Sequence, residues 1–299
     1  MITLDEAFAK FKSRQELTER EQEDVSNRHI KLREYVAQGV RLNESTPSFL
    51  TGSYKRWTKT RPLKDVDVFC VLHEDERHFR SAGPNVVLEH FEDLLASKYG
   101  EDQVTVDQMA VVVDFGVAVN EDGETDDKVM SIEVIPAFTK NDHFEIPDNH
   151  TGRWIETNPK VHEDLAVNAH AEYSGEWKPL VRMIKKWNET HGSPIQPSFM
   201  IEVMALELLV PPFSGGYPYE LKAFFANAAE HIHDTWADPA GLGPPVSSLM
   251  STSQKDTARK ALWAAEELVT QAQLQVRQGK NGDALRTWRE LFGPQFPLS

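Results

Sequence analysis

The stretch that most constrains the fold is residues 65–72, where two aspartates open a continuous apolar run. Its β-branched and aromatic composition indicates a buried strand. Side chains alternate along a strand, so Asp65 and Asp67 lie on one face and Val66 and Val68 on the other. Two carboxylates on one face repel each other unless a cation lies between them, and Mg²⁺ prefers such oxygen ligands. An acidic pair at a strand end also fits plain solvation, so the metal hypothesis needs support from other residues.

Two features upstream of this strand favour a phosphate-binding site beside the aspartates. Gly52 and Ser53 form a small turn whose backbone amides can approach phosphate oxygens closely. Between this turn and the strand the chain carries no acid and five cations: Lys55, Arg56, Lys59, Arg61 and Lys64. In a protein with a formal charge of −15, such a loop suits the balancing of polyphosphate charge better than simple solvation.

A third carboxylate is expected on a β-hairpin further along the chain. Residues 104–119 and 128–138 are apolar and β-branched, and an Asp-Gly turn lies in the segment 120–127 between them. This pattern is typical of a hairpin. Glu133 interrupts the second run, and a lone carboxylate there is costly to bury unless it is paired or binds a metal. Asp114, on the first run, is an alternative ligand.

Composition restricts the class of protein. At 299 residues, 40% hydrophobic and 26% charged, the chain has the composition of a soluble globular protein with room for two lobes. Its 47 acidic against 32 basic residues disfavour stable binding to DNA or long RNA. The single cysteine, Cys70, excludes an intramolecular disulfide and favours a reducing compartment. The N-terminus lacks the apolar core of a signal peptide and no run reaches membrane-spanning length, so we expect a cytoplasmic protein without membrane attachment.

The character of the chain changes after the hairpin. The segment 139–160 is polar and contains two prolines, which predicts a boundary between lobes. Residues 156–299 show mainly helical periodicity, and a long helix is expected within residues 13–41. The predicted fold is therefore α+β and bilobal. Residues 1–155 form a mixed sheet with helices, including the N-terminal helix, and residues 156–299 form a helical lobe that closes a nucleotide cleft.

The spacing of these features resembles a known superfamily. Gly-Ser at 52–53, eleven intervening residues, Asp-Val-Asp at 65–67 and the strand carboxylate Glu133 resemble the polymerase-β-like nucleotidyltransferases. Within that superfamily the chain is similar to the bacterial cyclic-oligonucleotide synthases, relatives of animal cyclic GMP–AMP synthase and oligoadenylate synthase. Four further stretches carry this narrower likeness, namely residues 131–137, 180–187, 197–202 and 284–297. The resemblance covers most of the chain, from Phe49 to the C-terminus.

The resemblance implies a role for each residue of the first lobe that has been named. Asp65, Asp67 and Glu133 would hold two Mg²⁺ ions, with Mn²⁺ as an alternative metal, and Gly52 and Ser53 would contact the triphosphate. The family normally has Asp where this chain has Glu133. Glutamate is one methylene longer, and the octahedral geometry of Mg²⁺ tolerates little distortion.

The resemblance also implies contacts from the helical lobe. Lys185 and Ser198 would reach the triphosphate, and Phe199 would stack on the base. Each aromatic or charged residue here has a simpler alternative, because helical lysines are usually solvated and aromatic side chains usually pack in a core.

The function implied is that of an Mg²⁺-dependent enzyme that joins nucleoside triphosphates into a cyclic di- or trinucleotide signal and releases pyrophosphate. Family members act in antiphage defence and pass the product to an effector protein. Two alternatives stay open. An RNA 3′-end nucleotidyltransferase of the CCA-adding type would need a basic surface, which a charge of −15 disfavours. A nucleotide-binding regulatory protein with a degraded site would fit the presence of Glu133.

Overall fold

The computed structural model describes residues 2–119 and 125–299, and the chain divides into two compact units. One unit is Leu17–Glu163, and the other combines Met1–Glu16 with Asp164–Ser299. This division differs from the predicted one at residues 155 and 156, because the first helix belongs to the helical unit and the second boundary falls within a helix. The predicted Asp-Gly turn lies outside the described residues.

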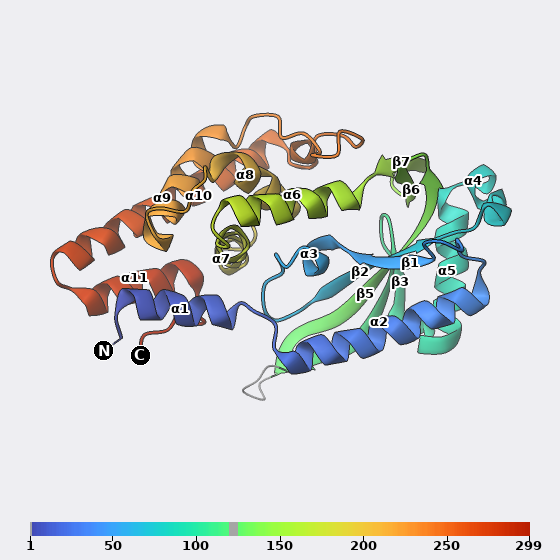
Figure 1. The fold of residues 1–299 in the computed structure, drawn as a ribbon, viewed down its shortest axis with the longest axis horizontal. Helices are drawn as coiled ribbons and strands as arrows, with labels where there is room; N and C mark the ends of the chain where they lie inside the picture. The colour runs from blue at the N-terminus through green and yellow to red at the C-terminus, as the bar shows by residue number, and fades with distance from the viewer. Residues whose placement is uncertain (1, 120–124) are drawn as a thin grey trace. The chain divides into compact units, whose positions relative to one another are not determined.

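The unit Leu17–Glu163 is built on a seven-stranded mixed sheet (Figure 1). Its strands are β1 (Ser48–Thr51), β2 (Asp65–Val71), β3 (Val104–Val106), β4 (Val111–Val119), β5 (Thr125–Lys140), β6 (His143–Asp148) and β7 (Arg153–Thr157). The order is β1-β2-β5-β4-β3, with β6 paired to β5 and β7 to β6. β2 and β5 run parallel, whereas the other neighbouring strands are antiparallel. A mixed sheet with helices confirms the predicted fold class.

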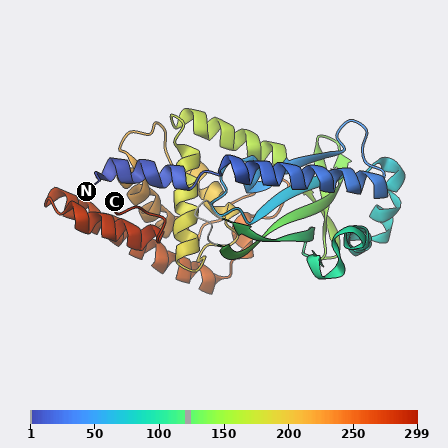
Figure 2. The ribbon, with the colours of Figure 1, turned by 90° about the horizontal axis from the view of Figure 1, so that it is seen from below.

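Two long helices cover one face of this sheet. They are α2 (Glu19–Gly39), which runs across the strands in both views, and α5 (Pro84–Tyr99) (Figures 1 and 2). Leu32 of α2 and Phe91 of α5 belong to the same buried cluster as Val66 of β2. The even-numbered residues of β2 therefore face the helices, which leaves the odd-numbered residues on the opposite face.

A second capping box divides the N-terminal region into two helices. The first is α1 (Leu4–Arg14), whose own capping box begins at Thr3. The Thr18 hydroxyl accepts the backbone N–H of Glu21 at 3.2 Å, and the Glu21 carboxylate accepts the N–H of Thr18 at 2.7 Å. This reciprocal pair fixes a new helix start. The long helix expected within residues 13–41 is confirmed as α2, and this capping box places its start at Glu19.

The polar segment 139–160 was expected to connect the lobes, but it contains β6 and β7. Pro147 obscures the strand pattern, yet it pairs with Trp154 of β7. Proline is confined to strand positions where the missing N–H is not needed. Phe144 and Ile146 are buried in a small cluster on the odd-numbered face of β2, so apolar packing overrides the weak strand signal.

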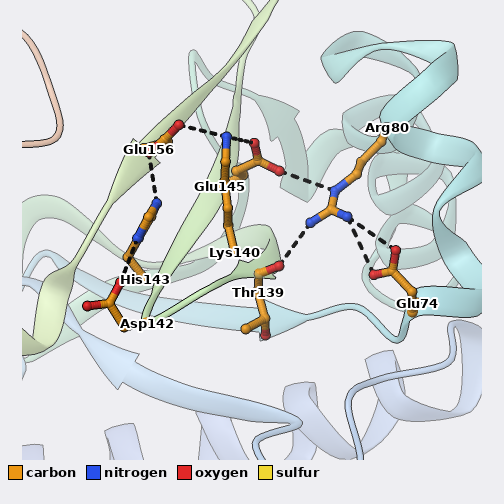
Figure 3. Close-up of polar contacts among 8 residues, drawn as sticks. All are labelled: Glu74, Arg80, Thr139, Lys140, Asp142, His143, Glu145 and Glu156. Carbon is orange, nitrogen blue, oxygen red and sulfur yellow. Dashed lines mark hydrogen bonds and ion pairs between the residues drawn. The ribbon is translucent and has the colours of Figure 1, made fainter.

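An ion-pair network joins β5, β6 and β7 (Figure 3). The Lys140 ammonium contacts Glu145 and Glu156, each at 2.6 Å. Arg80, from α4 (His78–Ala82), pairs with Glu145 at 3.2 Å and donates to the backbone carbonyl of Thr139 at 2.9 Å. The network thus fixes a short helix against the bend of β5.

His143 adds a titratable group to this network. Its ring nitrogens lie 3.0 Å from Asp142 and 2.8 Å from Glu156. The hydrogen bond that the His143 ring donates to Asp142 raises the pKa of His143 above its ordinary value of 6.5. A raised histidine pKa gives stability that is fully present below the unfolded pKa and is lost as pH rises through the folded pKa.

We therefore expect an NMR titration of His143 to give a pKa above 6.5. Replacing Asp142 by asparagine should lower that pKa, because the amide carries no charge to favour the imidazolium. Asp142→Asn leaves Glu156 in place, so it tests the Asp142 contact alone. An unchanged His143 titration in this variant would contradict the assignment.

The second unit is helical and has an aromatic core. Its helices are α1, most of α6 (Pro159–Glu172), α7 (Trp177–Thr190), α8 (Phe199–Leu208), α9 (Tyr217–His231), α10 (Thr252–Arg277) and α11 (Asn281–Phe292). Phe11 of α1 lies 4.7 Å from Phe292, measured between ring centroids, and Phe8 lies 4.8 Å from Trp288. These contacts explain why α1 joins this unit. Among the helices in the described ranges, none combines the length and apolarity that crossing a membrane requires.

Candidate active site

The parallel pairing of β2 with β5 brings two of the three predicted carboxylates together. Asp67 pairs in register with Glu133, and Asp65 pairs with Ser131. Neighbouring strands lie about 4.8 Å apart, and paired residues project on the same face. Further along both strands this face carries Phe69 and other apolar residues. The carboxylates therefore occupy the polar end of a face that is otherwise packed.

The environment of Glu133 is that of a carboxylate beside other carboxylates. Burial raises the pKa of Glu133 to about 7, and the charges of Asp67 and Asp107 add to the shift. The Lys59 ammonium acts in the opposite direction. Asp67 and Glu133 also share a hydrogen bond between their side chains. This pair accumulates more negative charge than the nearby cation balances, which is the environment that a bound cation would relieve.

Gly52 lies directly against the Asp67 carboxylate of β2. It begins the short helix α3 (Gly52–Lys55) that follows β1, and its φ is +68°. A Cβ at this position would lie 1.6 Å from Oδ2 of Asp67. Glycine is therefore required for two reasons, the left-handed backbone and the approach of Asp67. The predicted glycine turn and the predicted acidic strand form one packed unit.

The cations of the loop after α3 contact acids of their own unit. Lys59 forms an ion pair with Asp65. The Lys55 ammonium lies 3.3 Å from Glu163, and the Arg61 guanidinium lies 3.0 Å from Glu21. At least three of the five cations therefore already pair with carboxylates of the protein. This weakens the expectation that all five are placed to balance the charge of a bound polyphosphate.

The donor set is suited to Mg²⁺, although the three carboxylates are not grouped as ligands. Within residues 2–119 and 125–299, no three Asp, Glu, His or Cys side chains are arranged to hold one metal ion. Asp67 and Glu133 lie side by side, whereas Asp65 is turned to Lys59. Carboxylate oxygens are the ligands that Mg²⁺ prefers. The residues fit the metal on chemical grounds, and a metal at Asp65 would compete with the Lys59 ammonium.

Two further aspartates lie on this part of the sheet. Asp114 pairs with Ser131, so one strand separates it from Asp65. Asp107, which the sequence reasoning missed, influences Glu133 electrostatically. It lies in a turn, where its N–H donates to the carbonyl of Ala110 at 2.9 Å. That turn divides the predicted strand 104–119 into β3 and β4, and the Asp-Gln pair at 107–108 is the signal that could have shown it.

In the helical unit, Lys185 is buried rather than solvated. Lys185 of α7 is only 4% exposed. Its ammonium lies 2.7 Å from the carboxylate of Glu202 on α8, and Glu202 is 2% exposed. Ser198 is exposed at the start of α8. Phe199 is half-buried and packs against the core of this unit. Sequence reasoning missed Glu202, although a lone acid inside an apolar helix is the signal for such a partner.

A substitution series can separate the structural role of Lys185 from its predicted role. Glu202→Leu should destabilise the protein by about 3 kcal/mol, because the lysine stays buried without this carboxylate. The double variant Lys185→Met/Glu202→Leu should recover at least half of that loss, because it removes both charges. Denaturant unfolding measures both values. If the double variant recovers stability but is inactive, the loss of activity does not come from unfolding, and turnover needs Lys185 or its partner Glu202. Equal destabilisation in both variants would contradict the pairing.

The mixed sheet, its in-register carboxylates and the glycine turn against Asp67 define a nucleotidyltransferase. Residues 1–168, more than half of the chain, match the sequence profile of the Second Messenger Oligonucleotide or Dinucleotide Synthetase domain family. The chain belongs to this family. The resemblance seen in the sequence is confirmed.

Individual relatives agree with this assignment. The chain is 26% identical over 296 residues to a cyclic AMP-AMP-AMP synthase of Acinetobacter sp., covering 92% of this chain and 80% of the relative. Its fold matches that of CdnC from E. coli MS115-1 with a TM-score of 0.74 and 18% identity, over 99% of both chains. It also matches the di-nucleotide cyclase DncV of Vibrio cholerae, with a TM-score of 0.62 and 13% identity, over 84% of this chain and 70% of that one.

Proposed function

We propose that this enzyme joins nucleoside triphosphates into a cyclic di- or trinucleotide, using two Mg²⁺ ions held by Asp65, Asp67 and Glu133. The observation that carries the proposal is the register of Asp67 with Glu133 on the parallel strands, with Gly52 packed against Asp67. Because a curated relative is a cyclic AMP-AMP-AMP synthase, ATP is the first substrate to test.

The roles of the chain's own residues follow from their positions. The three carboxylates concentrate negative charge where the metal would lie, and the turn at Gly52 and Ser53 presents backbone amides beside them. Bound Mg²⁺ would lower the pKa of the attacking ribose hydroxyl and neutralise the departing pyrophosphate. The hydroxyl oxygen forms a bond to the α-phosphorus while the bond to pyrophosphate breaks. Lys185 and Ser198 are proposed to contact the triphosphate, and Phe199 is proposed to stack on the base.

The proposal extends to the partners of the enzyme. The cyclic product would pass to an effector protein in the same cell, as part of antiphage signalling in the cytoplasm. CdnC of E. coli MS115-1 has been solved in complex with a HORMA-deltaN protein, which supports testing for a protein partner here as well. No stable complex with DNA or long RNA is part of the proposal, in keeping with the charge of −15.

Product analysis tests the function directly. The purified protein is incubated with labelled ATP, GTP, CTP and UTP and Mg²⁺, and then with phosphatase. We expect small labelled products that resist phosphatase, because a cyclic product has no terminal phosphate, and no product when EDTA removes the metal. Label that enters only added RNA would support the CCA-adding alternative instead. Nucleotide binding without turnover would support a regulatory protein.

A further inference from the structure

A pocket lined by aromatic and cationic side chains lies in the unit Leu17–Glu163, away from the carboxylates. Its volume is about 270 Å³. The lining residues come from α2, α5 and β4, and they are Arg28, Lys31, Glu34, Tyr35, Gln38, Lys98, Tyr99 and Phe115. The pocket is slightly smaller than the range of about 300–1,000 Å³ usual for small-molecule sites, so it suits a ligand no larger than a mononucleotide.

The sheet separates this pocket from the catalytic face. Tyr35, Tyr99 and Phe115 pack against the cluster that contains Val66 and Val134, which is the face covered by the helices. The catalytic carboxylates project on the other face, because they alternate with these valines along β2 and β5. A ligand in the pocket therefore cannot contact the reacting groups.

Three aromatic rings line the pocket, those of Tyr35, Tyr99 and Phe115. Tyr99 and Phe115 meet edge to face with their centroids 5.4 Å apart. The Lys98 ammonium lies 4.4 Å from the centroid of the Tyr35 ring and 5.3 Å from that of Tyr99. The pocket thus places aromatic ring surface beside a positive charge, the combination that recognises a planar anionic molecule.

The charges of the pocket favour a phosphate group over a carboxylate. Arg28 is already engaged, since it pairs with Asp24 at 2.9 Å and donates to the carbonyl of Phe115 at 3.1 Å. Lys31 and Lys98 are exposed, and among the described residues neither pairs with an acid. Lys98 donates to the backbone carbonyl of Lys31, at 3.4 Å. Lys31 and Lys98 line the same pocket, and their two positive charges, against the one carboxylate of Glu34, suit the several oxygens of a phosphate.

We propose that the pocket between α2, α5 and β4 binds a nucleoside monophosphate, with its base against Tyr35, Tyr99 and Phe115 and its phosphate on Lys31 and Lys98. This site is separate from the substrate site and does not depend on the proposed reaction.

Binding is measured by isothermal titration calorimetry on the whole protein with EDTA present, and AMP is the probe. The variant Lys31→Ala/Lys98→Ala should weaken AMP binding at least about tenfold, because it removes two charge-assisted contacts. The matched control Lys260→Ala/Lys280→Ala removes two exposed lysines of the other unit and should leave AMP affinity within about twofold. Adenosine lacks the phosphate and ribose 5-phosphate lacks the base, so each should bind at least about tenfold more weakly than AMP.

The catalytic variant Asp67→Asn should bind AMP like the wild type, which separates this pocket from the active site. Equal AMP affinity in the wild type and in Lys31→Ala/Lys98→Ala would overturn the proposal, because the binding would then lie elsewhere. Absence of saturable AMP binding at millimolar concentration would overturn it as well. Ribose 5-phosphate binding as tightly as AMP would exclude the base contact with the rings.

Discussion

Replacing Gly52 by alanine is expected to reduce nucleotide transfer at least about 100-fold, because a displacement of about 1 Å at a catalytic group can cost that much. The added methyl group would lie 1.6 Å from Oδ2 of Asp67 and 2.4 Å from its Cγ. Only the end of a side chain stands in its way, so the carboxylate can rotate aside while the strand keeps its place. The variant should therefore fold and yet hold Asp67 in the wrong position.

Gly152→Ala is the matched control for this prediction. Gly152 has a φ of +65°, close to the +68° of Gly52, and a Cβ there meets nothing within 4 Å. Both variants thus carry a similar backbone cost, about 1–2 kcal/mol, but only one reaches a carboxylate. Rates of product formation and thermal unfolding of the two variants provide the comparison. Equal activity in both would show that the position of Asp67 does not depend on Gly52.

Replacing Glu133 by glutamine is expected to make the metal-free protein more stable and the enzyme inactive. The ordinary pKa of a glutamate side chain is 4.5, and burial raises the pKa of Glu133 in the folded protein to about 7. An acid with a raised folded pKa destabilises the fold above its unfolded pKa, and the penalty grows until the folded pKa is passed. At about pH 8 in EDTA we therefore expect Glu133→Gln to gain about 1–3 kcal/mol over the wild type.

The pH dependence checks the cause of this gain. Near pH 4.5 Glu133 is protonated in the folded protein and only about half ionised in the unfolded protein. The penalty is therefore small there, and the two proteins should have nearly equal stability. Addition of Mg²⁺ should stabilise the wild type by mass action and leave Glu133→Gln almost unchanged. An equal rise in melting temperature for both proteins would place the metal elsewhere, with Asp114 as the next candidate.

Turnover measurements on the Glu133 variants test the role of this carboxylate in the reaction. Glu133→Gln should lose at least about 100-fold in turnover, which is the scale of removing one electrostatic contact to the transition state. Glu133→Asp restores the residue usual in the family, keeps the charge and should remain active. The double variant Asp65→Asn/Asp67→Asn gives the reference for complete loss. Persistent activity in that double variant would show the carboxylate assignment to be wrong.

Local patterns predicted the elements that carry strong periodic signals. The strand that begins at Asp65, the long helix within residues 13–41 and the mainly helical character of residues 156–299 could all be predicted from the sequence. Pro147 hid β6, because the packing of Phe144 and Ile146 that fixes this strand is not local. The placement of α1 could not be predicted either, since the apolar side of a short helix does not reveal which core it will join.

The candidate site was predictable as a set of residues but not as an arrangement. The pairing of Asp67 with Glu133 joins positions far apart in the chain, and the contact of Gly52 with Asp67 depends on how β1 leads into α3. The resemblance to the family singled out Lys185, but only the fold shows that its ammonium pairs with Glu202. Charge at a single position can be read from the sequence, whereas the neighbour that balances it depends on tertiary structure.

The parallel register of β2 and β5 has a consequence for how this chain can vary in length. Insertions in the segments that connect the two strands leave Asp67 opposite Glu133, because the pairing itself is unchanged. One extra residue inside either strand would turn its carboxylate toward the apolar face beneath α2 and α5. Variation in length among functional proteins of this type should therefore be confined to the connections, and the spacing within the strands should be kept.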